Sequence, residues 1–156
     1  RCELLERCIN HLQEQTRLPD SILVVNNEST DATVDMLMRR KIQYITQENL
    51  GSAGGWNRCI SHALEHHFDA VWLMDDDGFP HPSALERLES NLDTGTACVS
   101  SVVLREKDRK RLHCIALLCF ALHRFALLCI ASLCFALLCF ALHCFALHCF
   151  ALLCIA

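Results

Sequence analysis

The sequence predicts an α/β fold in which a mostly parallel sheet carries helices on both faces. Two observations support this prediction. Short apolar runs alternate along the chain with segments whose apolar residues recur at helical spacing, and the most apolar of the early runs ends in three consecutive aspartates. Uninterrupted short apolar runs are typical of strands buried on both faces. Helices that alternate with strands serve as crossovers between parallel strands.

The first predicted element is a helix that is already under way near residue 3. Four apolar positions recur there at helical spacing: Leu5, Cys8, Ile9 and Leu12. A break at residues 19–20 leads into a short buried strand over residues 21–25. The polar cluster of residues 26–31 is expected to end that strand.

A second helix is expected over residues 32–40, with Thr30 or Asp31 as its N-cap. Its inner side would carry three apolar residues: Val34, Leu37 and Met38. A strand over residues 42–46 follows. The glycine-rich loop of residues 48–58 then opens a third helix, whose expected buried face is Trp56, Cys59, Ile60, Ala63 and Leu64.

The third strand is expected over residues 70–74, with Trp72 in the core. A fourth helix begins at residues 82–83 and would turn three leucines inward: Leu85, Leu88 and Leu92. Glu86 and Glu89 are expected to face water. A last strand over residues 97–103 completes the alternation.

Three carboxylates, those of Asp75, Asp76 and Asp77, directly follow the third strand. They are expected to emerge together at its carboxyl end, which is where open α/β sheets bind ligands. Adjacent like charges raise one another's pKa unless a cation or hydrogen-bond donors keep them ionised, and a hard divalent metal meets that need. The competing interpretation is a solvated turn, because glycine and prolines follow.

Two further polar loops are expected at the same edge of the sheet as the acidic triplet. The cluster of residues 26–31 offers amides and carboxylates that can bind a base or ribose, although a simple helix cap explains it equally well. The loop of residues 51–57 can bring backbone N–H groups and a helix N-terminus to a phosphate, with Arg58 close by. Together the three loops predict a nucleotide-diphosphate site with a bridging cation.

Three segments resemble the family 2 glycosyltransferases. ILVVNNESTDAT (residues 22–33) resembles the family motif VVDNxSTDGT, NLGSAGGWNR (residues 49–58) resembles NxGxAGGxNxG, and VWLMDDDGFP (residues 71–80) resembles the DxD strand of rhamnosyl- and galactofuranosyl-type members. The segments occur in the family's order and spacing. The resemblance covers about residues 1–104.

The resemblance implies a Rossmann-like GT-A fold that uses a nucleotide-diphosphate sugar, a divalent metal (Mg or Mn) and a saccharide or lipid-linked acceptor. Asp75 and Asp77 match the DxD pair and would hold the metal, Asp77 as the principal ligand. The residues predicted to bind the donor are Asn26, Asp31, Gly54, Gly55, Asn57, Arg58, Asp75 and Asp76. Nucleic acid is not an expected partner.

The sequence departs from the family pattern in four respects. The family's first strand would precede Arg1, Asn26 replaces the commoner aspartate, and Cys59 stands where glycine is frequent. The general base of inverting members should lie beyond residue 104. No catalytic residue is therefore assigned, and we expect a chain truncated at both ends.

A haloacid dehalogenase-type phosphatase is an alternative, since that class also places Asp-x-Asp after an apolar strand and uses the first Asp, here Asp75, as nucleophile. Against it, Phe79 stands where that class has Thr or Val, and the motif follows a late strand. His66, His67 and His81 are interpreted as surface or helix-end histidines.

The composition changes near residue 112. Residues 1–112 hold all 18 acidic residues and 13 of the 14 basic ones, whereas residues 113–156 hold one charge, Arg124, and eight of the 12 cysteines. This tail repeats every five residues. Where two copies of the repeat differ, the two amino acids have codons that differ by a single base. We expect residues 1–112 to be a partial GT-A nucleotide-sugar-binding domain and residues 113–156 to be a translated repeat that was not selected as a domain.

Three other interpretations of the tail remain open: a membrane segment, a five-residue-repeat β-solenoid and a Cys/His metal array. An inactive, membrane-tethered relic is the corresponding functional alternative. Because charged residues interrupt the start of the chain, no secretory signal is expected there. A cytoplasmic location is expected, with association at the inner face of the membrane if the tail inserts.

Overall fold

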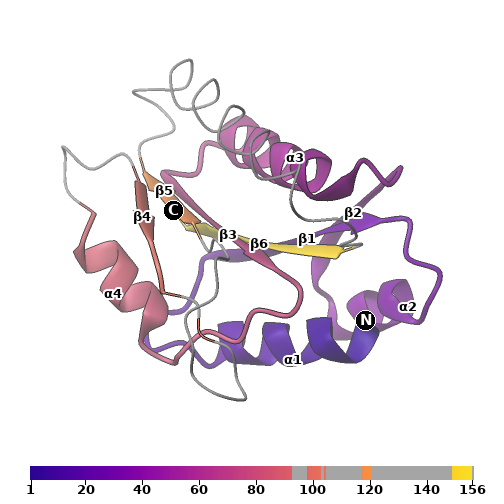
Figure 1. The fold of residues 1–156 in the computed structure, drawn as a ribbon, viewed down its shortest axis with the longest axis horizontal. Coiled ribbons are helices and arrows are strands. Elements are labelled where there is room, and N and C mark those ends of the chain that lie inside the picture. Colours follow the sequence, from indigo (N-terminus) through magenta and orange to yellow (C-terminus); the bar gives the residue numbers. More distant parts are fainter. Residues whose placement is uncertain (93–97, 103, 105–116, 121–148, 156) are drawn as a thin grey trace.

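The computed structural model describes residues 1–92, 98–102, 104, 117–120 and 149–155 (Figure 1). Helices and strands alternate through the first part of the chain. The elements are α1 (Cys2–Gln13), β1 (Ser21–Asn27), α2 (Thr33–Arg40), β2 (Gln43–Gln47), α3 (Gly51–Glu65), β3 (Ala70–Asp75), α4 (Ala84–Ser90), β4 (Cys98–Ser100), β5 (Leu117–Phe120) and β6 (Cys149–Ile155). All eight elements expected before residue 104 are present.

The strands form one sheet in the order β2-β1-β6-β3-β5-β4. β1 and β2 pair in parallel, β6 pairs antiparallel with both β1 and β3, and β5 pairs antiparallel with both β3 and β4. The four expected strands, β1 to β4, therefore all run in one direction. The α/β prediction is confirmed, and the sheet is mixed because two strands that were not expected, β5 and β6, lie between them.

The helices cover both faces of the sheet, with α3 on one side and α1, α2 and α4 on the other (Figure 1). Each side has its own core of buried side chains. On the α3 side the core is Leu23, Val25, Trp56, Cys59, Ile60, Ala63, Val71 and Leu73. On the opposite side it includes Leu5, Cys8, Ile9, Leu12, Val24, Met36, Leu37, Trp72, Met74, Leu85 and Leu88. β1 and β3 are thus buried on both faces, which explains why their sequences are continuously apolar.

The inner side of α2 differs from the prediction. Its buried residues are Thr33, Met36 and Leu37, whereas Met38 is 59% exposed. Both sets of positions have helical spacing, so periodicity alone could not separate them. The side of α2 that is buried, where the helix packs on α1, lies one residue earlier in the sequence than expected.

The expected tail contributes two strands to the sheet, β5 and β6. β6 has the sequence CFALLCI and lies between β1 and β3, a central position that suits a segment without charged residues. Residues 121–148 and the supposed junction at 105–112 lie outside the described residues. The division of the chain at residue 112 stays a prediction. Among the helices that the structure describes, none has both the length and the apolar character needed to cross a membrane.

Candidate functional site

The carboxyl ends of β1, β2 and β3 meet at one edge of the sheet, and side chains connect the loops that follow them. Gln47, at the end of β2, donates from Nε2 to Oδ1 of Asn27 at the end of β1 (2.9 Å). Asn27 in turn donates from Nδ2 to the carbonyl of Gly51 (3.3 Å), the first residue of α3. The predicted convergence of the first two loops is therefore confirmed.

Arg1 connects the acidic triplet to the first loop. Its guanidinium donates from Nε to Oδ2 of Asp76 (2.7 Å) and from Nη2 to Oδ1 of the same carboxylate. Nη2 of Arg1 also lies 3.9 Å from Oδ2 of Asp77. The amino group of Arg1 and the N–H of Cys2 each lie 3.1 Å from Oδ2 of Asp31. All three predicted loops thus belong to one polar network.

Asp76 is fully buried, and its carboxylate binds Arg1 at both oxygens. Burial raises the pKa of Asp76 above its usual range, and the Arg1 guanidinium opposes that rise. The sequence predicts a metal ion as the cation that compensates the triplet, but Arg1 already pairs with Asp76 and lies within ion-pair distance of Asp77. Because its carboxylate is enclosed, we expect Asp76 to act on a donor through Arg1 and not by direct contact.

Asp75 and Asp77 differ from Asp76 in exposure. The side chain of Asp77 is 50% exposed, and Asp75 is partly buried. The carbonyl of Asp75 accepts the N–H of Gly78 (3.1 Å), which closes a tight turn over the triplet. Carboxylate oxygens are the ligands that a hard divalent cation prefers, so the chemistry of these two side chains fits the Mg or Mn that the family resemblance implies.

Asn26 and Asp31 shape the first loop. Asn26 is buried, accepts the N–H of Ser29 at Oδ1 (3.0 Å) and donates to Oγ1 of Thr46 (3.3 Å). Its amide therefore holds the turn that ends β1. Asp31 accepts the N–H of Thr33 (3.1 Å) and also its hydroxyl, which is the chief reason that the pKa of Asp31 falls below its usual range.

The assigned N-cap of α2 is Ala32, without a side-chain cap, in place of the predicted Thr30 or Asp31. Asp31 nevertheless binds the first N–H of the helix, that of Thr33. The predicted capping contact is therefore present, although it comes from the residue before Ala32. Asp31 thus caps the start of α2, and its side chain remains 40% exposed at the edge of the sheet.

The glycine-rich segment is helical and not a loop, which corrects the prediction. α3 begins at Gly51, so Gly54, Gly55, Asn57 and Arg58 all lie in its first turns. Gly51 has a φ of +68° and donates its N–H to Oδ1 of Asn49 (3.1 Å), and this turn starts the helix. Gly55 is buried, whereas the side chains of Asn57 and Arg58 are exposed.

Glycine is required at position 54 because the side chain of Leu50 lies very close to its Cα atom. A Cβ atom at position 54 would overlap Cβ of Leu50. In an open helix, Gly→Ala stabilises by about 1 kcal/mol, but here we expect Gly54→Ala to lower the free energy of unfolding by about 1–2 kcal/mol. Chemical denaturation measures this, with Ser52→Ala in the same turn as the control. Adding Leu50→Gly should restore stability, and a stabilising Gly54→Ala would contradict the predicted overlap.

Arg1 is the residue that sequence reasoning missed at this edge. Its charge was noted only as an interruption of an apolar segment, and Arg58 was expected to supply positive charge. A helix that precedes a strand of an α/β sheet starts near the carboxyl edge of that sheet, so the first residue before α1 reaches the acids. That topological rule could have identified Arg1 before the structure was known.

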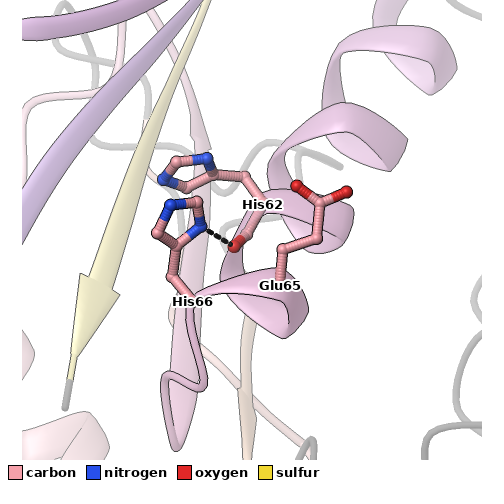
Figure 2. Close-up of side chains that lie close together, drawn as sticks. All are labelled: His62, Glu65 and His66. Atoms are coloured by element: carbon pink, nitrogen blue, oxygen red, sulfur yellow. Dashed lines mark hydrogen bonds between the residues drawn. The ribbon is translucent and has the colours of Figure 1, made fainter.

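A second polar cluster, which sequence reasoning also missed, lies on the last turns of α3. It consists of His62, Glu65 and His66 (Figure 2). His62 is buried, and burial is the largest cause that lowers its pKa. His66 is exposed, as expected, and so is His81, whose Nδ1 lies 3.0 Å from the hydroxyl of Ser83. The i, i+4 spacing of the two cluster histidines was the available signal.

Comparisons with known proteins identify the family. A family model described as "Glycosyl transferase family 2" matches residues 1–155. A curated relative from Mycolicibacterium smegmatis, "Galactofuranosyltransferase GlfT1", is 34% identical over 117 residues, which cover 72% of this chain and 39% of the relative. The protein of the same name from Mycobacterium tuberculosis (strain CDC 1551 / Oshkosh) is 36% identical over 107 residues, 65% of this chain and 33% of its own length. No solved structure matches the chain.

The chain therefore spans between a third and two fifths of the length of these curated relatives. The family match also decides against the phosphatase alternative. In agreement with this, the acidic triplet follows β3, the third strand of the chain, whereas the phosphatase class carries its motif on the opening strand.

Proposed function

Because this chain belongs to glycosyl transferase family 2, we propose that its carboxyl edge binds a nucleotide-diphosphate sugar for transfer to a saccharide or lipid-linked acceptor. The observation that carries the proposal is the hydrogen-bonded network joining the three loops. Asn27 and Gln47 connect β1, β2 and α3, and Arg1 connects the first loop to the acidic triplet. A ligand at this edge would meet all three loops at once.

Each loop has a role in this proposal. Asp75 and Asp77 would hold a divalent cation, Mg or Mn, which when bound supplies positive charge to the departing diphosphate. The first-turn N–H groups of α3 and the positive end of its dipole face the same edge and favour phosphate. The Asp76–Arg1 pair would keep the triplet in place. No residue in the described part of the chain is proposed as the general base.

The sugar that we propose is galactofuranose. Its support is the name of the curated relatives, which are galactofuranosyltransferases, at 34–36% identity to this chain. The sequence motifs point the same way, since residues 71–80 resemble the DxD segment of rhamnosyl- and galactofuranosyl-type members. A comparison of a galactofuranose donor with a rhamnose donor is therefore the most informative test.

A calorimetric donor panel tests this function. We expect the full chain, with Mn²⁺ present, to bind a nucleotide-activated galactofuranose at least about tenfold more tightly than the corresponding nucleotide-activated rhamnose, a difference of about 1.4 kcal/mol. The free nucleoside monophosphate serves as the control, because it lacks the diphosphate. Equal binding of both sugars would contradict the proposed sugar, and equal binding of the monophosphate would contradict the diphosphate site.

A further inference from the structure

The cluster of His62, Glu65 and His66 brings three metal-ligating side chains together at the C-terminal end of α3. Each offers one ligand atom, and these atoms all lie within 4.8 Å of one another. The two imidazole rings stack with centroids 3.9 Å apart, and Figure 2 shows them side by side next to the last turn of α3. His62 is only 6% exposed, so part of this cluster is already withdrawn from water.

We propose that His62, Glu65 and His66 form a metal site for Zn²⁺ or a similar transition metal. Two imidazole nitrogens and one carboxylate are ligands that Zn²⁺ accepts, at distances of about 2.0–2.2 Å. Ligand atoms around one tetrahedral Zn²⁺ are closer together than 4.8 Å, so the side chains must rotate toward a common point. His62 and Glu65 lie in the last turn of α3 and His66 is the residue that caps it, so all three approach the ion from one short segment.

The hydrogen bond of His66 is compatible with this role. Its Nδ1 lies 2.9 Å from the carbonyl of His62. When Nδ1 carries the proton and donates to that carbonyl, Nε2 keeps the lone pair that a metal needs. Metal-ligating histidines commonly bind a backbone carbonyl with the other ring nitrogen in this way.

The end of α3 is also held in one conformation. Past the last helical residue, the N–H of His66 binds the carbonyl of His62 (3.0 Å) and the N–H of Phe68 binds the carbonyl of Ala63 (3.0 Å). His67 takes a φ of 59° to close this turn. A fixed helix end lowers the cost of ordering the ligands when a metal binds.

This cluster is separate from the acidic triplet. α3 ends at Glu65, just before β3 begins at Ala70, whereas the triplet begins at Asp75, where β3 ends. The length of β3 therefore separates them, roughly 17 Å at 3.3 Å per residue. One ion cannot serve both. The ligands differ as well, since nitrogen favours Zn²⁺, Ni²⁺ and Cu²⁺, whereas carboxylates alone suit Mg²⁺ or Mn²⁺.

Calorimetric titration of the full chain with Zn²⁺ tests the proposal. Accessible thiols are first alkylated and metal is removed by chelation, because the chain has 12 cysteines and cysteine thiolates are also zinc ligands. We expect one high-affinity site that is weakened at least tenfold in His66→Ala and also weakened in Glu65→Gln, both of which change exposed residues. His81→Ala, another exposed histidine, is the matched control and should bind as the unsubstituted chain does.

Thermal unfolding gives a second readout. Zn²⁺ should raise the Tm of the unsubstituted chain and of His81→Ala, and raise it less in His66→Ala. The proposal is overturned if the unsubstituted chain binds no Zn²⁺ after alkylation, or if His66→Ala and Glu65→Gln bind it as tightly as the control. Donor binding with Mn²⁺ should be the same in His66→Ala, so the outcome is independent of the proposed function.

Discussion

Arg1→Ala is expected to lower the free energy of unfolding by about 3 kcal/mol, because it leaves the carboxylate of Asp76 buried without its ion-pair partner. Removing one partner of a buried ion pair typically costs about 3–5 kcal/mol. We expect the lower value here, because Asp76 is fully buried but the side chain of Arg1 is 33% exposed. Denaturant unfolding followed by tryptophan fluorescence measures the change. Arg39→Ala removes an exposed arginine of α2 and should change the free energy by less than about 0.5 kcal/mol.

The stability lost in Arg1→Ala is expected to depend on pH. Burial holds the pKa of Asp76 above its usual value, and Arg1 opposes this shift, so removing Arg1 raises the pKa further. A carboxyl group with a raised pKa in the folded state stabilises the fold at low pH, and that contribution is lost as the pH rises through the folded pKa. The penalty of Arg1→Ala should therefore be larger at pH 8 than at pH 4.

This pH series needs a chelator in the buffer, so that no metal ion alters the titration of the triplet. A penalty that is constant with pH, or that shrinks as the pH rises, would show that Asp76 does not depend on Arg1. A penalty no larger than that of Arg39→Ala would show that the ion pair itself is not a stabilising contact.

The second large effect is expected for Asp77→Asn in the presence of a donor. Mg²⁺ or Mn²⁺ should strengthen donor binding to the unsubstituted chain, and this strengthening should be lost in the variant, a change of at least about tenfold. The reason is that Asn keeps the shape of Asp but lacks the charge that a hard cation requires. Calorimetry with Mn²⁺ and then with excess chelator separates the metal-dependent part of the affinity.

Asp69→Asn is the matched control for that experiment. Asp69 is exposed and directly precedes β3, so it lies at the other end of the strand that carries the triplet. The control should keep the metal effect in full. If Asp77→Asn also kept it, the cation would not be held by the triplet.

Much of the fold could be predicted because the signals are local. Leu5, Cys8, Ile9 and Leu12 mark the buried face of α1 by their spacing alone, and all four are fully buried. The apolar runs of β1 and β3 indicated strands buried on both faces. Once the order of the elements was known, the parallel direction of β1 to β4 and the meeting of their loops followed from topology.

The remaining features depend on contacts between distant parts of the chain. The insertion of β6 between β1 and β3 joins residues more than 70 positions apart in the sequence, and no local pattern predicts it. The pairing of Arg1 with Asp76 is a contact of the same kind. Gly51 to Gly55 were predicted as a loop because glycine is a poor helix former, but Leu50 packs against Gly54 and the helix begins earlier.

We propose that Asp75 and Asp77 hold a cation that bridges to the diphosphate of a nucleotide sugar. The most direct test is a crystal of the full chain with Mn²⁺ and a nucleoside diphosphate, measured for anomalous scattering of manganese. We expect an anomalous peak about 2–2.3 Å from a carboxylate oxygen of Asp77, with the pyrophosphate bound to the same ion. A pyrophosphate bound elsewhere, with no manganese beside Asp75 and Asp77, would contradict it.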